Sequence, residues 1–129
     1  MLNKKIEIKL KGVEIPLWFN NFASAELQRM YGADTNTVVA KLLDRLNESY
    51  LFVLSDLIKA GIKGQYFAKD IEKPIYFSEI NEMLAEEPDD NLLKIWSEIW
   101  GVFSEHMGLN LPKEENASKK KVNTKKATL

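Results

Sequence analysis

The sequence contains no cysteine and only one histidine among its 129 residues. The missing cysteine excludes disulfides, thiolate metal sites and a cysteine nucleophile. A zinc site around the histidine, His106, would need carboxylates for every other ligand, and such a set suits zinc poorly. We therefore expect no metal, no cofactor and no catalytic residue.

Other signatures of catalysis are also missing. Gly61 and Gly64 are not followed by the Lys and Ser/Thr of a phosphate-binding loop. The carboxylate pairs 86–87 and 89–90 flank a predicted helix start, where capping and the helix dipole explain them. His106 lies near the end of the last predicted helix, which the same dipole favours. The sequence therefore predicts a protein that is not an enzyme.

Long apolar runs are absent as well. No run approaches the roughly 18 residues that a membrane span requires. The first twelve residues alternate charged and apolar side chains, unlike a signal peptide. We expect a soluble, cytoplasmic protein without a membrane partner.

Arginine is scarce, and the lysines are unevenly placed. Six lysines and two glutamates from Pro112 onward give this tail a charge of +4, so the rest carries −5 of the overall −1. A folded nucleic-acid reader usually shows a basic helical stripe, and the acidic body argues against that function. A small regulatory protein that binds nucleic acid through its tail stays as an alternative.

Apolar periodicity predicts one α+β, mainly α domain over residues 1–111. Ile6, Ile8 and Leu10 alternate with charged residues before Lys11-Gly12, and alternation resumes afterwards, which indicates a short N-terminal β-hairpin with Pro16 in an edge strand. Helical spacing predicts about five helices that pack on it, over residues 22–31, 37–46, 51–60, 80–86 and 89–107. We expect a loop over residues 65–76 and a disordered basic tail over residues 112–129.

The aromatic residues gather in three stretches. Trp96, Trp100 and Phe103 share one helical face, and core packing explains most such residues. A second stretch lies at the hairpin–helix junction, and a third brackets a charged segment without clear periodicity. Aromatic side chains are enriched at protein interfaces, so we predict a protein-binding surface formed by Trp18, Phe19, Phe22, Tyr66, Phe67, Tyr76 and Phe77.

The order of these features resembles a known family. A hairpin leads into a helix that carries Phe22, Leu27 and Tyr31 before Gly32, and a helix pair then leads to the segment LIKAGIKG at 57–64. A short helix and a long final helix follow. Over roughly residues 5–108 this order is similar to the tail assembly chaperones of long-tailed bacteriophages, although residues 65–77 match no family pattern.

This resemblance implies a non-enzymatic chaperone in the host cell cytoplasm, absent from the mature virion. Its partners would be the tape measure protein, which it keeps soluble, the tail tube protein and further copies of itself. Some members have a frameshifted longer form. Lys119, Lys120 and Lys121 suggest an A-rich, slippery message, a hypothesis that the codons would test. A structural tail or connector subunit is a further alternative.

Overall fold

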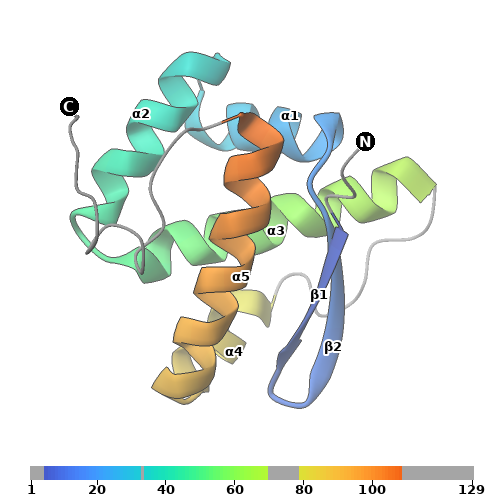
Figure 1. Ribbon diagram of the computed structural model, residues 1–129, viewed down its shortest axis with the longest axis vertical. Helices are drawn as coiled ribbons and strands as arrows, with labels where there is room; N and C mark the ends of the chain where they lie inside the picture. Colours follow the sequence, from blue (N-terminus) through green and yellow to red (C-terminus); the bar gives the residue numbers. More distant parts are fainter. Residues whose placement is uncertain (1–4, 33, 70–78, 109–129) are drawn as a thin grey trace.

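The computed structural model describes residues 5–32, 34–69 and 79–108, and the predicted fold class is confirmed there. This part of the chain contains an antiparallel hairpin and five helices. Figure 1 shows the hairpin beside α5, with α1 at its open end, α4 near its turn, and α2 on the side of α5 away from the hairpin. The elements are β1 (Lys5–Leu10), β2 (Val13–Trp18), α1 (Asn21–Tyr31), α2 (Thr35–Leu46), α3 (Tyr50–Lys69), α4 (Ile80–Glu86) and α5 (Asp89–Met107).

The hairpin forms where the alternating pattern predicts it. Lys11 and Gly12 have φ values of 50° and 78°, so the turn has two residues in the left-handed region, as in type I′ hairpins. Pro16 lies opposite Glu7. Because a two-residue turn makes Leu10 and Val13 a hydrogen-bonded pair, and such pairs alternate along the ladder, Pro16 and Glu7 form a non-hydrogen-bonded pair where a proline costs no ladder hydrogen bond. The carbonyl of Lys9, in the same set of positions, accepts a hydrogen bond from Asn91 of α5.

Helix α3 is the centre of the core and contacts β2 and all four other helices. Its buried side chains face the apolar side of the hairpin, so one continuous cluster joins strands and helices. The helix ends follow local capping rules. Asn20 Oδ1 accepts from the backbone N–H groups of Phe22 and Ala23 at 3.0 and 3.1 Å, and Gly32 and Gly108 end α1 and α5 in left-handed conformations.

Two sequence predictions about α3 are wrong. The helix does not end at Gly61 and Gly64, and residues 65–69 of the predicted loop are helical. The reason is close packing: a Cβ on Gly64 would lie 2.0 Å from the carbonyl oxygen of Trp18, and one on Gly61 would lie 2.8 Å from Leu17 Cβ. Both glycines therefore let β2 approach the helix. The rest of the predicted loop and the tail from 112 lie outside the described residues.

The other helix boundaries agree closely with the sequence patterns. The predicted break near Asn47 separates α2 from α3, and α4 covers the predicted residues 80–86. Helix α2 begins two residues earlier than expected, because Asp34 Oδ1 accepts from Thr37 N at 2.9 Å and caps it.

Candidate functional site

Three of the predicted binding residues meet on the surface. Phe22 in the first turn of α1 stacks on Phe67 in the last turns of α3, with ring centroids 5.7 Å apart. Tyr66 stacks on the same ring at 4.9 Å. Phe22 and Phe67 keep 50% and 49% of their surface exposed. We call Phe22, Tyr66 and Phe67 the aromatic patch.

Asn20 joins the two helices that carry the patch. Its side-chain oxygen caps α1, while its Nδ2 donates to the carbonyl oxygen of Gly64 at 3.2 Å. One side chain thus fixes the start of α1 against the end of α3. The patch is therefore held on helical scaffold at both sides, and its rings need little ordering when a partner binds.

A group of charged side chains lies beside the aromatic patch. Glu26, one turn after Phe22, is only 6% exposed. Its carboxylate accepts from Arg29 at 2.6 and 3.1 Å and from Lys63 Nζ at 3.4 Å. Lys63 Nζ also lies 5.4 Å from the ring centroid of Phe67, within cation–π reach. We call Glu26, Arg29 and Lys63 the ion triad.

The ion triad keeps Glu26 ionised. Burial acts to raise the pKa of this carboxyl, but the hydrogen bond from Arg29 and the charges of Lys63 and Arg29 outweigh it, so the pKa lies below its ordinary value. The sequence alone did not identify this group, although Glu26 and Arg29 are one helical turn apart. The spacing of Glu26 and Arg29 could not predict the whole group, because Lys63 belongs to α3 and the other two residues belong to α1.

The two ends of the hairpin differ in charge. The patch end carries the cations Lys5, Arg29, Lys63 and Lys69, and its carboxylate Glu26 is buried. At the turn end, Lys11 pairs with Glu86 at 3.2 Å and donates its backbone N–H to Glu87. Figure 1 shows these two regions at opposite ends of the hairpin. Other carboxylates of the turn end are Glu79, Glu82, Asp89 and Asp90.

The remaining predicted binding residues have different outcomes. Trp18 is half-buried at the patch end, with Lys5 Nζ 4.2 Å from its ring centroid. The prediction for Phe19 is wrong: it is 1% exposed and packs edge-on against Phe103 at 5.9 Å. It precedes the Asn20 cap, and its side chain enters the core. Tyr76, Phe77 and the lysines 119–121 lie outside the described residues.

The predicted core position of the α5 aromatics is confirmed for Phe103, which is fully buried. Trp96 and Trp100 stack at 5.2 Å and pack partly buried against the core. Tyr50 extends the run from α3 at 5.7 Å from Trp96. These rings join Phe19 in one series, here called the core series, in which Phe19 and Phe103 are buried and Tyr50, Trp96 and Trp100 are half-buried at the edge of the core.

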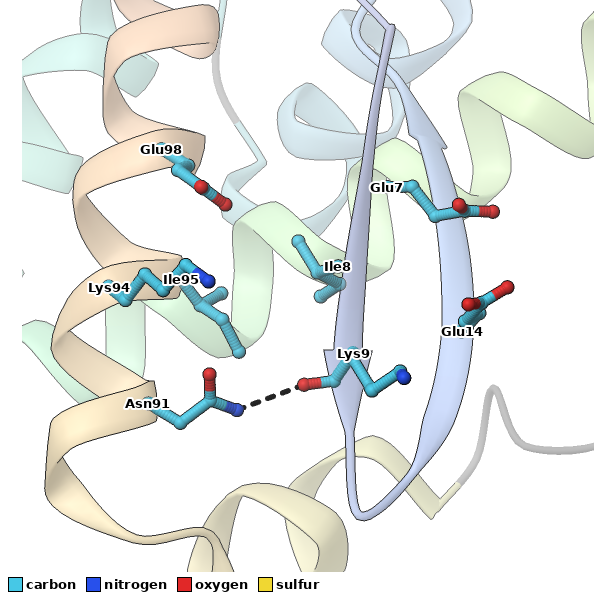
Figure 2. A pocket seen from close by; sticks show the side chains of 8 residues that line it. All are labelled: Glu7, Ile8, Lys9, Glu14, Asn91, Lys94, Ile95 and Glu98. Atoms are coloured by element: carbon cyan, nitrogen blue, oxygen red, sulfur yellow. Dashed lines mark hydrogen bonds between the residues drawn. The ribbon is translucent and has the colours of Figure 1, made fainter.

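The cavity between the hairpin and α5, about 230 Å³, gathers no reactive set of groups. Figure 2 shows Glu7 and Glu14 on the hairpin and pointing away from α5, while Lys94 and Glu98 belong to α5. The hydrogen bond from Asn91 to the Lys9 carbonyl closes one side. In the described ranges, no three His, Cys, Asp or Glu side chains lie together as a metal site.

One polar pair was not foreseen from the sequence. Ser24 Oγ lies 2.8 Å from His106 Nε2 beside a second cavity. A serine nucleophile needs such a base, but also an exposed turn and oxyanion donors. Ser24 instead sits in the regular first turns of α1, so we assign the pair to joining α1 and the end of α5.

Comparison with known proteins gives no relative: no family model, no curated protein and no solved structure matches the chain. None of the helices in the described part combines the length and hydropathy needed to cross a membrane. The fold thus defines a mainly helical α+β domain, and its function has to be inferred from its surface.

Proposed function

We propose that this chain is a non-enzymatic tail assembly chaperone of a long-tailed bacteriophage, which binds the tape measure protein and keeps it soluble in the host cytoplasm. The aromatic patch carries this proposal. Isolated exposed apolar residues are common on protein surfaces, but here the half-exposed rings of Phe22 and Phe67 stack on each other, and Tyr66 stacks on Phe67. Such a rigid aromatic cluster suits the apolar face of a helix.

The order of the elements adds support. The succession of hairpin, helix ending at Gly32, helix pair and long final helix resembles that of the chaperone family. The tape measure protein is long and helical, so many weak contacts along it would combine into tight coating. The tail tube protein would displace the chaperone, which would then be absent from the finished particle.

Co-expression with a tape measure fragment tests this function. The wild-type chain should move the fragment into the soluble fraction, and the double variant F22S/F67S should lose most of this effect. Phe52→Ser is the matched control, because Phe52 is 48% exposed and also lies under a cation, Arg45, at 5.3 Å. A fragment that stays insoluble with the wild-type chain would refute the proposal, and detection of the chain in purified virions would favour a structural subunit.

A further inference from the structure

The surroundings of the aromatic patch carry information about the partner. Lys63 lies over the Phe67 ring, Lys69 is exposed two residues after it, and Arg29 is 69% exposed on α1. The Glu26 carboxylate of this region is buried and paired with two of these cations. A partner helix on the patch therefore meets apolar rings first and positive charges at their edge.

We propose that the partner is an amphipathic helix whose apolar stripe is bordered by carboxylates; this inference rests on the proposed function and names the chemistry of the client segment. The spacing agrees with a helix. The patch rings are 5.7 and 4.9 Å apart, and side chains one turn apart on a helix are separated by about 5–6 Å. Two apolar residues at i and i+4 of a partner helix are thus spaced like neighbouring rings of the aromatic patch.

The position of Arg29 extends this match along α1. It follows Phe22 by seven residues, or roughly 10 Å along the helix axis. A client helix that runs along α1 would bring a residue two turns from its apolar anchor near this guanidinium. A glutamate or aspartate there would be attracted, and a lysine would be repelled.

Single-stranded nucleic acid also binds aromatic and cationic surfaces, but the contacts here favour a protein. Arg29 and Lys63 share the Glu26 carboxylate, so this group offers a partner one net positive charge, which suits a few carboxylates better than a continuous row of phosphates. The body outside the tail is acidic, which opposes a phosphate backbone. An acidic helix needs only a few charges in register, whereas a nucleic acid brings one at every nucleotide.

Two synthetic helical peptides test the proposal against the full-length protein. Both have the same leucine stripe, and the flanking positions carry glutamate in one and lysine in the other. Fluorescence anisotropy should show about tenfold tighter binding of the glutamate peptide at low salt, because several exposed ion pairs add up although each is weak. The difference should shrink at high salt, which screens exposed charges.

Surface variants separate the apolar from the charged contribution. The double variant F22S/F67S should bind the glutamate peptide roughly tenfold or more weakly than the wild type, as loss of a hot-spot aromatic does. The control variant Phe52→Ser should bind this peptide with the affinity of the wild type. Lys69→Glu should reduce the preference between the peptides, and Lys94→Glu, exposed on α5, should not.

Each other outcome overturns the inference. Equal affinity for both peptides would remove the charge preference, and tighter binding of a labelled oligothymidylate would identify nucleic acid as the partner. Self-association that F67S abolishes would assign the patch to a second copy. If neither peptide binds, solubilisation of the tape measure fragment shows whether only this inference fails or the proposed function fails with it.

Discussion

Two groups of aromatic side chains stack in this protein, one that runs from the core to its half-buried edge and one on the surface. Phe19 and Phe22 belong to different groups although they are three residues apart: Phe19 is 1% exposed and Phe22 is 50% exposed. Asn20 lies between them and caps the start of α1, so the chain passes from strand to helix at this point. The same stretch of sequence thus contributes one ring to the fold and the next to a surface that can bind.

The two groups also differ in what surrounds them. The core series of Phe19, Phe103, Trp100, Trp96 and Tyr50 packs in or against the cluster of aliphatic side chains. The aromatic patch instead has the ion triad beside it. Burial of a ring among apolar side chains stabilises the folded chain. Fixed charges next to exposed rings favour binding of a partner with complementary charge.

The largest expected effect separates these groups directly. Phe19→Ala should lower the free energy of unfolding by about 3–5 kcal/mol, because it removes a buried ring and leaves a cavity. Phe22→Ala and Phe67→Ala should change it by no more than about 1 kcal/mol, as exposed substitutions usually do. Urea denaturation followed by circular dichroism measures all three. A loss for Phe22→Ala as large as that for Phe19→Ala would mean that the patch belongs to the core.

Local chemistry explains why part of this fold could be predicted. The Lys11-Gly12 turn, the Asn20 cap and the terminal glycines 32 and 108 each act within a few residues, so their sequence signals were sufficient. The assignment of Phe19 to the surface failed because Phe19 and Phe22 have the same residue type. The packing of α3 and α5 around this segment decides which of them is covered.

The candidate site shows the same limit. Phe22 and Phe67 were singled out separately, but their contact depends on two segments that Asn20 and Gly64 join across 44 residues. Gly61 and Gly64 resemble helix-ending glycines in sequence, and only the approach of β2 reveals them as packing positions. Tertiary contacts of this kind leave no local pattern.

A pair of glycine substitutions would sharpen the comparison between the patch end and α5. Gly64→Ala should cost about 1–3 kcal/mol or more, because the new methyl group meets the backbone oxygen of Trp18. Gly101→Ala, beside Trp100 on α5, has no atom within 4 Å of the added Cβ and should stabilise the protein by up to about 1 kcal/mol. Thermal unfolding of both variants measures this difference, and equal midpoints would contradict the close approach at Gly64.

The smallest expected effect concerns the ion triad. The pKa of Glu26 is lower in the folded chain than its ordinary value. The ionised carboxylate therefore stabilises the fold fully at pH values above that ordinary pKa. This contribution is lost as the pH falls through the folded-state pKa. Glu26→Gln should therefore cost about 1–2 kcal/mol near pH 7, by loss of charged hydrogen bonds, and progressively less as the pH falls below the ordinary carboxyl value of 4.5.

Urea denaturation of the wild type and of Glu26→Gln across this pH range gives the two stability curves. Glu98→Gln, exposed on α5, is the matched control and should show no comparable difference near neutral pH. A constant gap between the Glu26→Gln and wild-type curves would mean that the side chain matters for its shape and not for its charge. Converging curves would instead show that the cations beside the aromatic patch are held by an ionised carboxylate, whereas the core series is held by apolar packing.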